Sequence, residues 1–190
     1  MKPVVSNNPL RFYTLSAIFA ALTAVSAYFK IPLPYVPITL QTYFVLLSGT
    51  LLRPKYSAFS QILYLTIGLV GAPVFAHGGG PAYIFQPTFG YLLSYPIAAY
   101  IISHLTRFKI KEEHSQPSDV HVAAACCVGV LIILILGAGV LYLNLKHIVH
   151  KPVSLGTLFV SYFLIFVPGD MIKIILAVLT TKKLYRLQLL

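Results

Sequence analysis

The sequence has little charge, few acidic residues, only two cysteines and no tryptophan. Charged residues make up 9% of its 190 positions, against about 25% in soluble domains, and 58% of the residues are hydrophobic. The mean hydropathy is +0.84, which excludes an intrinsically disordered chain because disorder requires low hydrophobicity. The scarcity of charge therefore indicates a small integral membrane protein that packs as one domain over residues 1–190.

Several sequence motifs that carry chemistry are also missing. Cys126 and Cys127 are adjacent in an apolar run, where they cannot readily bridge each other, so we interpret them as packing residues. The chain contains no P-loop, no G-x-S-x-G motif and no H-E-x-x-H motif, so it is not expected to hydrolyse ATP by itself. His77 has no second ligand at metal-binding spacing, and no metal site is predicted. A binding protein fits these absences better than an enzyme.

Six apolar segments follow one another along the chain. Each approaches the roughly 20 residues that a helix needs to cross a bilayer. The segments are 12–29, 36–52, 57–76, 83–105, 121–143 and 154–181. They predict an all-α, polytopic membrane protein with six transmembrane helices.

The net charge of +10 comes from 14 Lys and Arg residues against 4 Asp and Glu. In a soluble protein such a charge would suggest nucleic acid as a partner. Here the cations stand at the ends of the apolar segments, so we expect no nucleic acid and regard membrane lipid as the surrounding medium. Ten of the cations fall in the two termini and in the loops at 53–55 and 107–111, whereas the alternate loops hold three. By the positive-inside rule, the N- and C-termini are predicted to be cytoplasmic.

The two loops predicted to face outward carry unusual residues. Three prolines, Pro32, Pro34 and Pro37, stiffen the first loop, and a glycine run at 78–80 lies in the second. Irregular backbone at membrane depth is stable only against protein or a water-filled cavity. Both loops are therefore predicted to be structured lids, with ordinary turns between helices as the alternative.

Asp170 is the only acidic residue inside an apolar segment. A charge within the membrane is expensive and is a functional candidate by default. Lys173 follows three residues later, on the same helix face, and Pro168 and Gly169 come just before, where they predict a kink that exposes polar backbone. The pair can bind a ligand with N–H donors and an acceptor, or it can be an ion pair that holds helices together.

Other polar side chains in the apolar segments are weaker candidates for a ligand site. They are Gln41, Gln61, Gln86, Tyr35, Tyr43, Tyr83 and Tyr91. Gln41 directly follows the proline loop and is predicted to face the same outer side as Tyr83. The tyrosines can instead form the interfacial belt that is common at the ends of membrane helices.

Small residues recur at helical spacing in the first segment. Ala17 and Ala21 form one small-xxx-small pair, and Ala20 and Ala24 form a second. Such pairs allow helices to approach closely. The sequence leaves two uses open, internal packing and docking to a separate membrane protein.

Several blocks of sequence together resemble the biotin transporter family BioY. They are Ile-Pro-Leu-Pro-Tyr-Val-Pro-Ile-Thr-Leu-Gln-Thr at 31–42, Val-Leu-Leu-Ser-Gly at 45–49, Gly-Leu-Val-Gly-Ala-Pro-Val-Phe-Ala at 68–76, Pro-Thr-Phe-Gly-Tyr-Leu at 87–92 and Pro-Gly-Asp-Met-Ile-Lys at 168–173. The resemblance implies the substrate-binding (S) component of an energy-coupling factor (ECF) transporter in a prokaryotic cell membrane. It also implies six helices and an outward-facing biotin pocket, covered by the loop after the first helix.

The resemblance further implies which residues and partners take part. Asp170 and Lys173 match the family's polar pair and are expected to contact biotin, while Gln41 and Tyr91 belong to signature blocks. The alanine face of the first helix is expected to dock onto a transmembrane coupling subunit. Two ATPase subunits complete the transporter and alone bind ATP, so the chain itself needs no cofactor.

The sequence also departs from the family pattern. Gln86 and Phe89 stand where the family usually has glycine, and this favours, as an alternative, an S component for another small vitamin. A second alternative, from a different class, is an intramembrane enzyme that uses Asp170 as a general base.

Overall fold

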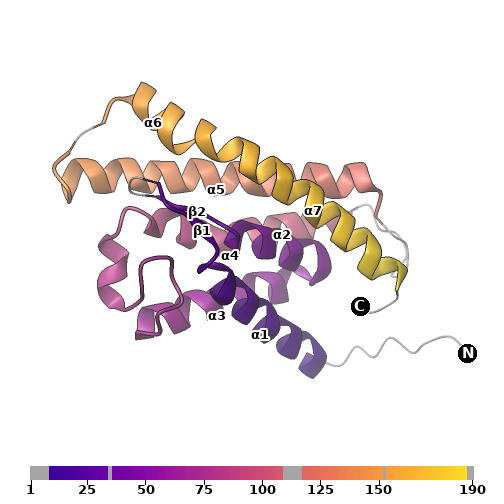
Figure 1. Cartoon of the computed structure of the whole chain (residues 1–190). Helices are drawn as coiled ribbons and strands as arrows, with labels where there is room; N and C mark the ends of the chain where they lie inside the picture. Colours follow the sequence, from indigo (N-terminus) through magenta and orange to yellow (C-terminus); the bar gives the residue numbers. More distant parts are fainter. Residues whose placement is uncertain (1–8, 34–35, 109–116, 152, 188–190) are drawn as a thin grey trace, which may run out of the picture.

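The computed structural model describes residues 9–33, 36–108, 117–151 and 153–187 and is predominantly helical (Figure 1). Its elements in chain order are α1 (Pro9–Ser26), β1 (Lys30–Ile31), β2 (Ile38–Thr39), α2 (Gln41–Leu51), α3 (Pro54–Val70), the 3-10 helix η1 (Pro81–Phe85), α4 (Phe89–Phe108), α5 (Asp119–His147), α6 (Leu155–Tyr162), the 3-10 helix η2 (Leu164–Phe166) and α7 (Val167–Arg186). The predicted all-α fold class is confirmed. In the part of the chain that the structure describes, the sheet is a single pair of two-residue strands, β1 and β2.

Close packing between helices depends on small residues at their crossings. Ile102 of α4 lies between Gly49 of α2 and Gly129 of α5. A Cβ atom added at Gly49 would lie 2.7 Å from the Ile102 side chain, and one added at Gly129 would lie 2.2 Å from it. The three backbones therefore approach more closely than larger residues would permit. In Figure 1, α5, α6 and α7 lie along one side of the molecule, while α1 to α4 form the other side.

Among the described residues, three stretches are long and apolar enough to cross a membrane: Pro9–Ser26, Asp119–His147 and Gly156–Arg186. By contrast, α2 has 11 residues and a length of roughly 16 Å, about half the thickness of a hydrocarbon core. The chain is thus a multi-pass membrane protein, and the count of six crossings stays a prediction.

Four predicted segments differ from the observed helices. The helix within 57–76 ends at Val70, and the segment 83–105 is divided between η1 and α4. The segment 36–52 contains a helix only from Gln41, because residues 38–39 pair with β1 instead. The segment 154–181 is interrupted at Phe163, whose φ and ψ of −124° and −66° are not helical. Pro168 stands in the first turn of α7, and the helix is interrupted in the turn before it, where the kink was predicted, by the 3-10 helix Leu164–Phe166.

The described parts of the two loops predicted to face outward are bonded to each other. In the first loop, β1 and β2 pair antiparallel, with Lys30 opposite Thr39. The second loop, at 71–80, turns at glycines with positive φ, including Gly78 at 111°. Tyr28 donates a hydrogen bond to the carbonyl of Pro73 at 2.6 Å, which ties the first loop to the second.

The start of α1 and the end of α7 lie at the same end of the molecule (Figure 1). The end of α4 and the start of α5, which flank the basic segment beginning at Arg107, also lie there. This arrangement supports the prediction that both termini are on one side of the membrane.

Candidate functional site

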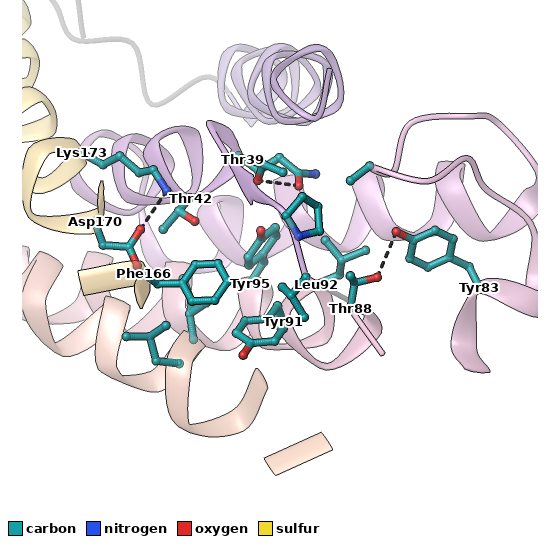
Figure 2. A pocket seen from close by; sticks show the side chains of 16 residues that line it. Thr39, Thr42, Tyr83, Thr88, Tyr91, Leu92, Tyr95, Phe166, Asp170 and Lys173 are labelled. Atoms are coloured by element: carbon teal, nitrogen blue, oxygen red, sulfur yellow. Dashed lines mark hydrogen bonds and ion pairs between the residues drawn. The ribbon is translucent and has the colours of Figure 1, made fainter. Parts of the chain in front are cut away.

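A cavity lies where two loop segments, the strand β2 of the first outward loop (the lid strand) and the second loop at 71–80, meet α2, α4, α5 and α7 (Figure 2). About 480 Å³ of space lies between its lining atoms when the open solvent at its mouth is included. Its lining residues are Val36, Pro37, Thr39, Gln41, Thr42, Ala76, Tyr83, Thr88, Tyr91, Leu92, Tyr95, Ile133, Leu134, Phe166, Asp170 and Lys173.

Asp170 and Lys173 form a buried ion pair on the wall of this cavity. Lys173 Nζ donates to Asp170 Oδ1 at 2.8 Å, and the two residues are 3% and 7% exposed. Asp170 lies in the first turn of α7, where the positive end of the helix dipole stabilises a carboxylate. The bond uses one of two carboxylate oxygens and one of three ammonium hydrogens, so the pair retains both acceptor and donor capacity for a ligand.

Gln41 lies at the start of α2, 1% exposed, and its amide is bonded on both sides. Thr39 Oγ1 donates to Gln41 Oε1 at 3.0 Å, and Gln41 Nε2 donates to the hydroxyl of Tyr64. Tyr64 in turn donates to the carbonyl of Val74 at 3.3 Å. Gln41 thereby joins the lid strand to the second loop, which fixes the mouth of the cavity.

Aromatic rings form the middle of the cavity. Tyr91 and Phe166 lie with their ring centroids 5.8 Å apart, and Tyr95 is 3% exposed on the same helix as Tyr91. The Tyr91 hydroxyl donates to the carbonyl of Tyr162 at 2.8 Å, so this group is satisfied by protein. Beneath the Tyr91 ring is Gly137, where a Cβ atom would lie 2.3 Å from ring atom Cδ1.

A second polar pair, Tyr83 and Thr88, lies at the other end of the cavity in Figure 2. Thr88 Oγ1 donates to the Tyr83 hydroxyl at 3.1 Å. Both side chains are buried, with exposed fractions of 4% for Tyr83 and 7% for Thr88. The cavity therefore has polar groups at both ends and an aromatic centre.

The structure brings five of the six predicted ligand residues together in this cavity. They are Asp170, Lys173, Gln41, Tyr91 and Tyr83. Gln86 is not among them.

Gln86 is exposed at the end of η1 and does not line the cavity. Phe89 is buried but also does not line it. The weaker candidates Gln61 and Tyr43 bond elsewhere: Gln61 Nε2 donates to Ser60 at 3.0 Å, and the Tyr43 hydroxyl pairs with Thr180. The remaining candidate, residue 35, lies outside the described residues.

Sequence reasoning missed several lining residues. Tyr95 follows Tyr91 by four residues and therefore shares its helix face, which is a signal that could have found it. Thr42 directly follows Gln41 in the proline-loop block. Phe166 has no comparable signal, because its position depends on the break between α6 and α7.

The two alanine pairs of α1 have different environments. Ala20 is 3% exposed in the core, and Ala24 is half-buried against it, so this pair contributes to internal packing. Ala17 and Ala21 are exposed on the neighbouring face of the same helix. Docking through Ala17 and Ala21 stays a prediction.

The fold and the cavity together define an integral membrane protein that can hold a small molecule between two polar ends. The family model of BioY matches residues 1–189, and the chain belongs to the BioY family. This is a family of transporter components rather than enzymes, so the intramembrane enzyme with Asp170 as its base is not supported.

Similar proteins agree with this assignment. The "Probable biotin transporter BioY" of Lysinibacillus sphaericus is 39% identical over 170 residues, which cover 90% of this chain and 84% of the relative. The "Biotin transporter BioY" of Thermotoga maritima is 36% identical over 91% of this chain and 95% of the relative. A crystal structure of the "S-component for biotin from an ECF-type ABC transporter" superposes with a TM-score of 0.80 at 28% identity, covering 96% of this chain and 95% of that chain.

Proposed function

We propose that the chain is the biotin-binding S component of an ECF transporter, located in a prokaryotic cell membrane. The observation that carries the proposal is the buried Asp170–Lys173 pair on the wall of a small-molecule cavity. An ion pair within one helix is a poor reason to bury two charges in a membrane, whereas a ligand that bonds to both compensates their desolvation.

The chemistry of biotin fits this wall. Its ureido ring offers two N–H groups, which suit the carboxylate of Asp170, and a carbonyl oxygen, which suits the ammonium of Lys173. The fused rings are apolar on their faces and can pack against Tyr91, Tyr95 and Phe166. Of the remaining candidates, Gln41 positions the lid strand and Tyr83 contributes a hydroxyl.

Transport by this chain requires partner proteins. In the proposed arrangement, six spans with cytoplasmic termini form a single domain that captures biotin at the outer face. A transmembrane coupling subunit and two ATPase subunits supply the energy, and they alone bind ATP. The exposed Ala17 and Ala21 provide a flat face on α1 for the coupling subunit.

An S component for another vitamin is the alternative. The sequence feature that favoured it was the replacement of family glycines by Gln86 and Phe89. Because neither side chain lines the cavity, this feature gives no reason to expect a different ligand.

Titration calorimetry of biotin into the detergent-purified chain tests the proposal, with riboflavin and thiamine as competitors. We expect biotin to bind and neither competitor to displace it. A folded chain that retains no biotin, or that binds riboflavin or thiamine in preference, would contradict the assignment.

Copurification with the coupling subunit tests the docking face. Ala21→Leu should leave biotin binding intact and reduce assembly, because the added side chain separates the two helices. Ala124→Leu on the exposed face of α5 is the matched control and should assemble normally. Equal assembly of both variants would remove Ala21 from the docking face.

A further inference from the structure

The short helix η1 buries little of its own surface. Tyr83 is buried at the end of the cavity, with its ring centroid 4.6 Å from that of Phe75. The other four residues of η1 are exposed, and the exposed fractions of Ile84 and Phe85 are 47% and 64%. A helix of five residues is not stable by itself, so the position of Tyr83 depends on the contacts that η1 makes with its neighbours.

Asn144, near the end of α5, makes one of these contacts. Its side-chain Nδ2 donates to the backbone carbonyl of Phe85 at 2.7 Å. Asn144 is 4% exposed and does not line the cavity, so any effect that it has on a ligand is indirect. Its own carbonyl accepts from the N–H groups of Ile148 and Val149, at 2.8 and 3.1 Å, which fixes the last turn of α5.

The end of α5 is firmly attached to α4. One turn before Asn144, Val140 packs against Gly90 of α4, where a Cβ atom on the glycine would lie 2.4 Å from Val140 Cβ. Gly137 lies equally close beneath the Tyr91 ring. The bond from Asn144 therefore fastens η1 to the same helix pair whose residues line the middle of the cavity.

The other atom of the Asn144 amide has no such contact. Asn144 Oδ1 is buried without a hydrogen-bond partner in the part of the chain that the structure describes. An unpaired buried acceptor destabilises a folded protein. Leucine has a similar size and no polar atom, and the carbonyl of Phe85, in an exposed turn, can bond to water instead. Asparagine is therefore a poor residue for stability here, and its bond to η1 is the contact that gives it a use.

We propose that Asn144 is a positioning residue for the ligand site, which holds η1 so that Tyr83 stays against the cavity. For the identity of the ligand this inference rests on the proposed function, whereas the attachment of η1 does not depend on it. Without the bond η1 moves more freely, and a ligand must order it on binding, which weakens the affinity.

The variant Asn144→Leu tests the proposal by three measurements. Its biotin affinity by titration calorimetry should fall roughly 2- to 12-fold, the range for one hydrogen bond between neutral groups. Its thermal unfolding temperature should equal or exceed that of wild type, because the unpaired oxygen is removed. Hydrogen–deuterium exchange of the amides of Tyr83 and Gln86, which bond within the η1 turn, should accelerate, while exchange in α4 stays unchanged.

Thr106→Val is the matched control. Thr106 Oγ1 is also a buried oxygen without a partner in the described part of the chain, and it lies near the end of α4 that is distant from η1. Its removal should likewise preserve the unfolding temperature, but it should leave biotin affinity and the exchange of η1 as in wild type. Asn144→Ala covers the case in which Asn144→Leu does not fold, and it should show the same loss of affinity and the same faster exchange.

A double variant shows whether Asn144 acts through Tyr83. In a Tyr83→Ala protein the tyrosine is no longer there to be positioned, so the addition of Asn144→Leu should reduce affinity little further. A further reduction as large as the one in wild type would overturn the proposal, because Asn144 would then act by another route.

The remaining contrary outcomes concern the single variants. Unchanged affinity in a folded Asn144→Leu protein would overturn the proposal. So would a lower unfolding temperature with unchanged exchange of η1, which would make Asn144 a purely structural residue. Wild type that binds no biotin would refute the proposed function, while the exchange measurement would still decide whether Asn144 holds η1.

Discussion

Replacement of Asp170 by asparagine removes one charge while it preserves the shape of the side chain. In the wild type, Asp170 Oδ1 accepts from Lys173 Nζ at 2.8 Å, and both residues are more than nine-tenths buried. Asp170→Asn therefore has two separable effects. It weakens the acceptor that a ligand N–H group would use, and it leaves the Lys173 ammonium buried without its counter-ion.

The magnitudes of these effects follow from the burial of the pair. Loss of a hydrogen bond to a charged group costs about 1.5–3 kcal/mol, which weakens biotin binding by roughly 10- to 150-fold. Removal of one partner from a buried ion pair costs about 3–5 kcal/mol of folding stability. Both figures apply with little solvent screening, because Asp170 is only 3% exposed.

A double variant separates binding from stability. Asp170→Asn together with Lys173→Met leaves no buried charge, so its thermal unfolding temperature should recover toward wild type. Its biotin affinity, measured by titration calorimetry in detergent, should not recover. Wild-type affinity in a folded Asp170→Asn protein would refute the role of Asp170, and restored affinity in the double variant would show that Asp170 only neutralises Lys173.

Two further predictions concern the aromatic wall and the mouth of the cavity. Gly137→Ala places a Cβ atom 2.3 Å from the Tyr91 ring, so it should destabilise the protein by about 1–3 kcal/mol and weaken biotin binding. The control Gly139→Ala adds a Cβ atom that meets nothing within 4 Å, so it should have neither effect. Thermal unfolding and titration calorimetry of both variants test this prediction. Lys30→Gln should raise the pKa of His77 without fully restoring its ordinary value, because burial is the larger cause of the lowering. Proton NMR of the imidazole against pH measures this pKa. An unchanged pKa would contradict the influence of the Lys30 charge on His77.

The sequence alone predicted much of the fold. The low charge and the apolar segments required a helical membrane protein, because backbone groups in lipid must be satisfied within the chain. The breaks inside helices were less predictable. Phe163 is not a helix breaker, and its non-helical conformation depends on how α6 and α7 pack.

The candidate site shows a similar division. Asp170 and Lys173 could be found because charges within an apolar segment are rare, and the structure places both on the cavity wall. Gln86 was expected beside them because it adjoins a signature block. The short helix η1 instead exposes it, while Tyr83, in the same helix, is buried against the cavity.

The sequence by itself determined that the chain enters a membrane, that its cations mark one side, and that a single intramembrane carboxylate stands next to a lysine. These properties depend on residue type and on local spacing along a helix, which the sequence displays directly. The tertiary structure decided which alanine pair of α1 faces outward and which residues far apart in sequence enclose the cavity. It brought Tyr83 and Asp170, which are 87 positions apart in the sequence, to opposite ends of one cavity, because the packing of α4 against α5, and of α7 against α2 and α5, sets that distance.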